Sequence, residues 1–182
     1  MTLVLGVVNP HGVWQTSDIR LFDANQGKPI QDPSTKQFTF QAPDGAGTIA
    51  YTGLGRLNPD EHVSEVIFKL LRGMSGGVES TLAAIQAFAS NRIAPIAYKH
   101  GVGHTFVACG FKDQVPWLAS ISNDAAALYY DQVLRVGNPK AKTITDHFEG
   151  GFLDVGGGAS VVAGMHESVS DVDYEILRRI MT

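Results

Sequence analysis

The chain has 182 residues, 44% of them hydrophobic and 18% charged, which excludes an intrinsically disordered protein and allows one domain with a substantial core. The formal net charge of -4 offers no basic surface, so we expect no nucleic-acid partner. Cys109 is the only cysteine, which excludes an internal disulfide and favours a reducing, cytoplasmic location.

The first eighteen residues predict a β-hairpin that begins with the apolar run 2–8 and returns toward Asp18 after a turn at 9–12. The run is too short to span a membrane and no basic residue precedes it, so we expect neither a membrane partner nor a leader longer than Met1. Removal of Met1 would leave Thr2 with a free α-amine beside its hydroxyl. That pair is a nucleophile with a built-in base, which makes the start of the chain a candidate active site.

Strand and helix signals follow in separate blocks. Residue types predict strands at 38–40 and 48–52, joined by a turn at 44–47. The motif Asn58-Pro59-Asp60-Glu61 is typical of a helix start, and apolar residues at helical spacing continue that helix to Leu71. A second helix is predicted over 79–89.

The second half of the chain predicts a hairpin of strands 104–111 and 116–121, a strand at 129–136, a glycine corner at 156–158, a short helix at 159–165, and a last helix from Ser170 that buries Ile176, Leu177 and Ile180. No linker, repeat or low-complexity segment interrupts the chain, so we expect a single domain over residues 1–182. Segregated blocks of strands and helices favour an α+β fold in which two antiparallel sheets pack face to face between helices.

This layout resembles the proteasome-type N-terminal nucleophile hydrolases. The segment Thr16-Ser17-Asp18-Ile19-Arg20 is similar to the family's aspartate-x-arginine return strand, and Lys36 is similar to its active-site lysine. In Ala50-Tyr51-Thr52-Gly53-Leu54-Gly55, Gly53 matches the glycine that supplies an oxyanion-hole amide in the family. A match without gaps would instead place Ser34 at the lysine position, and the sequence leaves both assignments open.

The resemblance also implies a fold, an activity and partners. The fold is a four-layer αββα sandwich, and it would lack the family's last two strands because those follow the point where this chain ends, at Thr182. The activity is cleavage of peptide or other amide bonds by Thr2, and the implied partners are an amide substrate and further copies of the chain in a homo-oligomer. Gly157-Gly158-Ala159-Ser160 is similar to the family's Gly-Ser-Gly-Ser corner, so Ser160 is expected either to support Thr2 or to cap the following helix.

The chemistry assigns one role to each residue. The Thr2 α-amine, with an ordinary pKa of about 7.7–8.0, can accept the proton that the hydroxyl loses as it attacks a carbonyl. A nearby Lys36 ammonium would favour the deprotonated forms of both groups, and Asp18 would hold that lysine. The Gly53 amide would face the developing oxyanion.

Two other functions remain open at this stage. A non-catalytic homologue, kept as a structural or binding subunit, is favoured by the absence of the family's C-terminal aspartate and serine. An amidase acting on a small molecule would use the same nucleophile on a different substrate. Alone, Asp18 and Arg20 would be a surface ion pair, Lys36 a solvated charge and Gly53 a turn residue.

The remaining candidate motifs predict no cofactor and no metal. His100 and His104 are four residues apart, but the glycines between them argue against the helix that a metal-binding pair would need. The glycines at 156–158 are not followed by the Lys-Ser/Thr of a phosphate-binding loop. Cys109 lies in an apolar strand and is expected in the core.

Overall fold

The computed structural model describes residues 3–17, 21–23, 28–30, 35–124, 127–130, 133–136, 144–155, 158–164, 176 and 179. The helices are α1 (Val63–Gly73), α2 (Val78–Phe88), a π-helical turn η1 (Ala89–Ile93) and α3 (Ala94–His100). The strands are β1 (Leu3–Asn9), β2 (Gly12–Ser17), β3 (Leu21–Asp23), β4 (Lys28–Ile30), β5 (Gln37–Ala42), β6 (Gly45–Thr52), β7 (Arg56–Asn58), β8 (Glu61–His62), β9 (Thr105–Lys112), β10 (Val115–Asp124), β11 (Ala127–Tyr130), β12 (Val133–Val136), β13 (Ile144–Asp154) and β14 (Ala159–Gly164).

The strands form two five-stranded sheets, with orders β11-β12-β14-β1-β2 and β13-β10-β9-β6-β5, beside two small hairpins. The fold is therefore α+β, as predicted. The second sheet is antiparallel throughout, because each of its neighbours runs opposite to the next. The first sheet departs from the prediction of two antiparallel sheets, since β12 runs parallel to β14.

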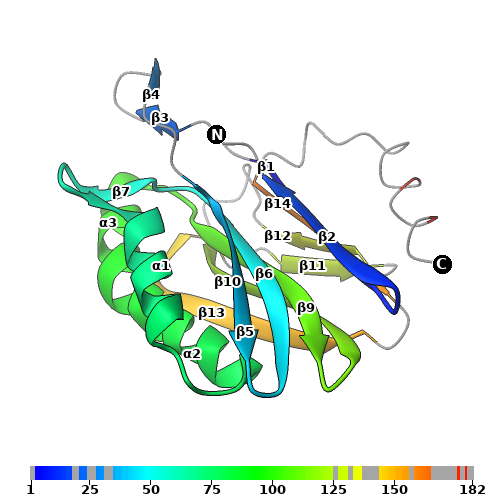
Figure 1. Cartoon of the computed structure of the whole chain (residues 1–182). Helices are drawn as coiled ribbons and strands as arrows, with labels where there is room; N and C mark the ends of the chain where they lie inside the picture. The colour runs from blue at the N-terminus through cyan, green and yellow to red at the C-terminus, as the bar shows by residue number, and fades with distance from the viewer. Residues whose placement is uncertain are drawn as a thin grey trace.

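Three described layers lie on one another: helices, the β13–β5 sheet, and the β11–β2 sheet (Figure 1). The helices α1, α2 and α3 cover one face of the β13–β5 sheet, where bulky side chains such as Tyr51, Phe106 and Trp117 form the core. Between the two sheets, a second core consists mainly of small aliphatic side chains, among them Val4, Ala50, Val107, Cys109, Ala159 and Val161. Alternate residues of β6 and β9 thus serve the two cores in turn, as the two-residue strand period requires.

All three predicted hairpins are confirmed with small shifts of their ends, and the first of them is β1 paired with β2. The strands predicted at 104–111 and 116–121 are β9 and β10, and those predicted at 38–40 and 48–52 are β5 and β6. The turn between β5 and β6 also starts a helix, since the Asp44 carboxylate accepts the N–H of Val78 at 2.7 Å. An acceptor at this position satisfies one of the free amides at the N-terminus of α2.

The predicted helix start at Asn58 is wrong. The Asn58 carboxamide donates to Glu61 and accepts the N–H of Asp60, so the motif closes the β7–β8 hairpin, and α1 begins at Val63. Polar side chains of this kind compete with the helix for backbone groups. The second predicted helix is confirmed as α2, and it continues through η1 into α3, which the sequence interpretation missed.

Two further expectations change in the last third of the chain. The short helix predicted at 159–165 is wrong, because Ala159–Gly164 is strand β14, paired with β1 and β12. The strand predicted at 129–136 is two strands, β11 and β12. In the predicted last helix, Ile176 is helical but 50% exposed rather than buried. Leu177 and Ile180 lie outside the described residues.

Among the helices of the described part, none is long and apolar enough to cross a membrane.

Candidate active site

Only part of the predicted site lies within the described residues. Thr2 and Asp18 lie outside them, as does Ser34, the alternative to Lys36. The structure describes Lys36, Gly53 and Ser160, together with strand β1 from Leu3 onward.

Gly53 forms a tight corner at the end of β6. Its φ of +107° lies in the region that only glycine adopts without strain. A Cβ at this position would lie 2.6 Å from the Gly103 carbonyl oxygen and 2.8 Å from the His104 Cα. Both conformation and space therefore require glycine here, which fits an amide group held at a sharp turn.

Lys36 lies beside this corner. Tyr51 donates its backbone N–H to the Lys36 carbonyl at 3.1 Å, and the next pair in the ladder is Gln37 with Ala50. The register therefore places Lys36 opposite Tyr51, two residues before Gly53. The Lys36 side chain is only 2% exposed, which is rare for a lysine and typical of one with a partner. Strand pairing thus places the buried Lys36 opposite Tyr51, two positions along the ladder from the glycine corner.

Ser160 lies elsewhere. It pairs with Val7 on β1, whereas Leu3, at the start of that strand, pairs with Gly164. At about 3.3 Å per residue, Ser160 is roughly 13 Å along β1 from Leu3. Its Oγ is buried and has no hydrogen-bond partner among the described residues. Because residue 160 belongs to a strand, it caps no helix. Thr2, the residue that it was expected to support, lies outside the described residues, so that role stays a prediction.

His104 is a site residue that the sequence interpretation considered only as a metal ligand. It is fully buried, and its Nδ1 accepts the backbone N–H of Leu54 at 3.0 Å, next to Gly53. The ring stacks on Tyr51, with centroids 5.5 Å apart and planes 15° apart. Burial lowers the pKa of His104 to about 3 because the interior disfavours the charged form. A lone histidine directly before an apolar strand was the available sequence signal.

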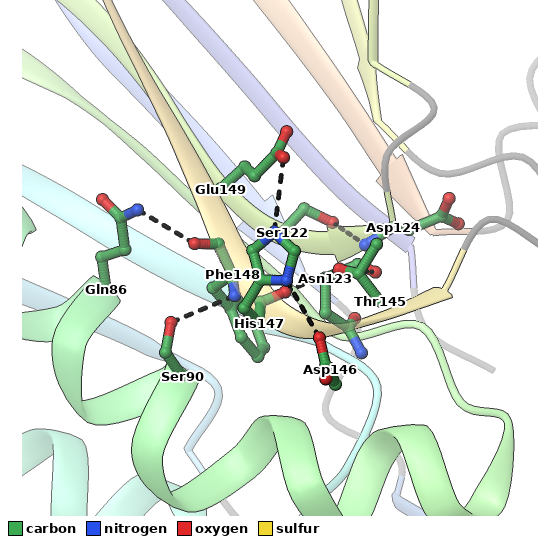
Figure 2. Close-up of polar contacts among 10 residues, drawn as sticks. All are labelled: Gln86, Ser90, Ser122, Asn123, Asp124, Thr145, Asp146, His147, Phe148 and Glu149. Carbon is green, nitrogen blue, oxygen red and sulfur yellow. Dashed lines mark hydrogen bonds and ion pairs between the residues drawn. The ribbon is translucent and has the colours of Figure 1, made fainter.

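The backbone of His104 is itself held in place. Its N–H donates to the Asn123 side-chain oxygen at 2.6 Å, and the Asn123 N–H donates back to its carbonyl at 3.2 Å. Figure 2 shows Asn123 near the end of β10, beside Ser122, Asp124 and Thr145. The Thr145 hydroxyl on β13 lies 3.1 Å from the Asn123 carbonyl oxygen and 2.7 Å from the His147 carbonyl oxygen, and it can donate to one of them at a time. The support of the Gly53 corner therefore extends across the sheet.

Two further nucleophilic or titratable side chains, Cys109 and His147, do not contribute to this corner. Burial raises the pKa of the Cys109 thiol to about 12, so this cysteine is a core residue, as predicted. His147 is exposed between Asp146 and Glu149, and hydrogen bonds to both carboxylates raise its pKa (Figure 2). No group of three or more metal-ligating side chains occurs within the described ranges.

Two hollows of the described structure lie along strand β5. One, of about 760 Å³, runs between β5 and α1 and is lined by Thr35, Phe38, Phe68 and Leu71 among others. The other, of about 880 Å³, lies between β2 and the β5–β6 hairpin. Neither is lined by Lys36 or Gly53, although Thr35 and Gln37 on either side of Lys36 line the first.

Comparison with known proteins adds no relative: no family model, curated protein or solved structure matches the chain.

Proposed function

We propose that the chain is a threonine-type N-terminal nucleophile hydrolase of the proteasome type, acting on peptide or other amide bonds. The observation that carries the proposal is the register between β5 and β6, which brings the buried Lys36 beside the glycine-only corner at Gly53. Cation and amide donor are the two groups that an N-terminal threonine needs nearby, one to favour deprotonation and one to stabilise an oxyanion.

The proposed reaction proceeds in two steps, acylation of Thr2 and hydrolysis of the ester. The Thr2 hydroxyl attacks the substrate carbonyl while its proton passes to the α-amine. The amide C–N bond then breaks, the leaving amine takes that proton, and an ester to Thr2 remains. Water hydrolyses the ester by the same route, which returns the free hydroxyl and releases the acid. Lys36 lowers the proton affinity of the α-amine, Asp18 compensates the lysine charge, and the Gly53 N–H binds the carbonyl oxygen in both steps.

The proposal includes a four-layer sandwich. Ser160 and Val162 alternate with Val161, which packs between the sheets, so they lie on the opposite face of β14. Both are fully buried there, and Val7 on the neighbouring strand is 7% exposed. Burial on the face away from the second sheet is what a further helical layer would produce.

The hollow between β5 and α1 is the candidate place for the substrate's side chain. Its lining mixes apolar residues such as Phe38 and Leu71 with charged ones such as Glu65 and Arg72, and it reaches Thr35, the neighbour of Lys36. Its volume lies in the range usual for ligand sites. Assembly into a homo-oligomer, with the sites facing an interior, follows from the same proposal.

The decisive experiment is the intact mass of the purified protein before and after incubation with a β-lactone, with peptide mapping of any adduct. The proposal requires loss of Met1 and one adduct, on Thr2. The matched variant Thr2→Ala should lose Met1 equally well and take no adduct.

The outcomes separate the three candidate functions. A chain that retains Met1, or that is processed but takes no adduct, would point to a non-catalytic subunit. Adduct formation with turnover of small amides but of no peptide would point to a small-molecule amidase.

A further inference from the structure

Strand β5 ends the helix-covered sheet, and its pairing with β6 defines which backbone groups are free at its outer edge. Lys36 and Tyr51 form a hydrogen-bonded pair, since the Tyr51 N–H donates to the Lys36 carbonyl. Such pairs alternate with non-bonded ones along an antiparallel ladder. Gln37, Thr39 and Gln41 therefore direct their backbone N–H and C=O groups away from β6. Within the described structure no further strand lies beside these groups.

Two other sheet edges are protected against pairing, whereas the edge at β5 is not. Strand β13, at the opposite edge of the same sheet, carries the exposed carboxylates of Asp146 and Glu149. On β2, an edge of the first sheet, the Gln15 carbonyl accepts the Gln37 carboxamide at 3.1 Å. Strand β5 contains no charged residue and no proline, which are common means of keeping an edge strand from pairing with another chain.

Both faces of this edge are accessible. The hollow of about 760 Å³ lies on its helix side and the hollow of about 880 Å³ on its β2 side, and both are lined by Gln37, Thr39, Phe40 and Gln41. Strand β2 itself packs over β6 and β9. The side chains of Thr39 and Gln41 are exposed. An added strand would therefore meet free backbone groups and have room for its side chains on either face.

The residues at this edge form a palindrome, Gln37-Phe38-Thr39-Phe40-Gln41. A two-fold axis through Thr39 would pair two copies of β5 antiparallel, with Thr39 opposite Thr39 and Gln37 opposite Gln41 of the second copy. These are the residues whose backbone groups point outward, so each N–H would meet a C=O of the other strand. On the helix side, each Phe38 would lie opposite a Phe40. Threonine and aromatic pairs of this kind stabilise antiparallel sheets.

We propose that β5 is a dimerisation edge, through which two copies of the chain pair antiparallel about a two-fold axis at Thr39 and join their helix-covered sheets into one. The palindrome favours a second copy over a foreign peptide, because a two-fold interface requires a self-complementary surface. The lining of the β2-side hollow supports the same partner. It contains no ionisable side chain, and Gln37 and Gln41 of a second copy would bring uncharged amides to it. This inference goes beyond the proposed function and does not depend on Thr2.

The test is sedimentation velocity of the full chain over a concentration series. We expect wild type to sediment as a dimer or as a larger assembly built from dimers. Thr39→Lys would place two like charges directly opposite each other on the axis and should raise the Kd of the β5 contact at least about 100-fold. Thr16→Lys, the same change at an exposed threonine of β2, is the matched control and should associate like wild type.

Three results would overturn the proposal: a monomeric wild type, a Thr39→Lys protein that associates like wild type, or equal dissociation of Thr39→Lys and Thr16→Lys. The last would show that added surface charge, and not the β5 edge, controls association. A monomer that takes a β-lactone adduct on Thr2 would overturn only this inference. A dimer with the expected response to Thr39→Lys but no adduct would overturn only the proposed function.

A charge exchange tests the axis itself. Thr39→Glu alone should dissociate like Thr39→Lys, but an equimolar mixture of the two proteins should associate, because a lysine would then face a glutamate across the axis. Among the residues of β5, only one that lies on a two-fold axis meets its own counterpart in the second copy. A mixture that stays monomeric would overturn the pairing of Thr39 with itself.

If Thr39→Lys does not fold, as far-UV circular dichroism would show, Gln41→Pro replaces it. Proline at this position removes an N–H that points away from β6, so the ladder within the sheet is kept, and edge strands tolerate proline at such positions. We expect the same loss of association. A folded Gln41→Pro protein that associates like wild type would contradict the inference.

Discussion

The two hydrophobic cores of this molecule differ in the size and type of their side chains. On the helix side of the β13–β5 sheet, aromatic side chains such as Trp117 and Phe106 fill a broad space. Between the two sheets, the core holds valines, alanines, Leu118 and Cys109, and no aromatic ring from the described residues. Glycines provide the room that the first core needs: a Cβ at Gly47 or Gly110 would lie within 3 Å of the Trp117 ring. The first core therefore depends on volume, and the second on close approach of two backbones.

Removing side-chain volume from the helix-side core should give the largest loss in the free energy of unfolding. Trp117 is fully buried and stacks on Phe152, with centroids 5.5 Å apart. We expect Trp117→Ala to lower the free energy of unfolding by about 3–5 kcal/mol, through lost burial and the cavity left behind. Urea denaturation measures the change. The exposed Trp14 provides the matched control, since Trp14→Ala should change stability by less than about 1 kcal/mol.

Adding volume should be the more damaging change between the sheets. A Cβ on Gly6 would lie 2.9 Å from Val161 Cγ1 and 3.4 Å from Cys109 Sγ. We expect Gly6→Ala to destabilise the protein by about 1–3 kcal/mol through overpacking. The double variant Gly6→Ala/Val161→Ala should recover part of the loss, which a double-mutant cycle would measure.

Gly73 offers a control for the same substitution. Apart from its chain neighbours and the backbone of its own helix, no described atom lies within 4 Å of a Cβ built there, at the end of α1. Gly73→Ala should be neutral or stabilising by up to about 1 kcal/mol. A destabilised Gly73→Ala would show that the Gly6 effect does not arise from crowding.

The helix-side core should also respond to pH, because it contains His104. The folded pKa of about 3 lies below the unfolded value of 6.5, so the unfolded chain binds the extra proton. Stability from this group is fully present above pH 6.5 and is lost as the pH falls toward 3. Between pH 6.5 and 5 we expect a loss of about 2 kcal/mol, at 1.36 kcal/mol per pH unit. The loss should be absent from His104→Asn, and an identical pH dependence in both proteins would contradict the assignment.

The smallest loss in the free energy of unfolding is expected from removal of a hydrogen bond at strand β13, on the edge of the helix-covered sheet. Ser90 accepts the N–H of Phe148 at 3.0 Å, and Gln86 donates to its carbonyl at 2.9 Å, as Figure 2 shows. We expect Ser90→Ala to cost about 0.5–1.5 kcal/mol in urea denaturation, the net value of one such hydrogen bond. The exposed Ser80 is a matched control, and Ser80→Ala should have a smaller effect. Equal losses of unfolding free energy in Ser90→Ala and Ser80→Ala would mean that the hydrogen bond from Phe148 to Ser90 does not stabilise the protein.

Where local pattern and tertiary packing agreed, the fold could be predicted from the sequence. Strands β9 and β10, with a turn at Asp113 and Gln114, follow from residue type alone. Prediction failed where the same residues are compatible with two local structures. At Asn58 the side chain could cap a helix or close a hairpin, and in the structure its carboxamide closes a hairpin. It failed also at Ala159–Gly164, where burial on both faces in the centre of a sheet outweighs the alanine content.

The site was predictable only in part, for a similar reason. Gly53 could be selected through the resemblance of residues 50–55 to a family motif, and the structure gives it a conformation that requires glycine. The role of His104 depends on its approach to Leu54, 50 residues away in sequence, and no local pattern reports such a contact. The position of Ser160 depends on the register of β14 against β1, another contact between distant parts of the sequence, so its place in a strand could not be foreseen.

The single thiol between the sheets also allows separation of the two sheets to be followed through its chemical reactivity. Cys109 is fully buried, and its raised pKa of about 12 leaves almost no thiolate to react in the closed form. Modification by a maleimide therefore requires the two sheets to separate, at least briefly. Because the sequence holds no other cysteine, the labelling rate of the native protein would count those openings without any engineered probe.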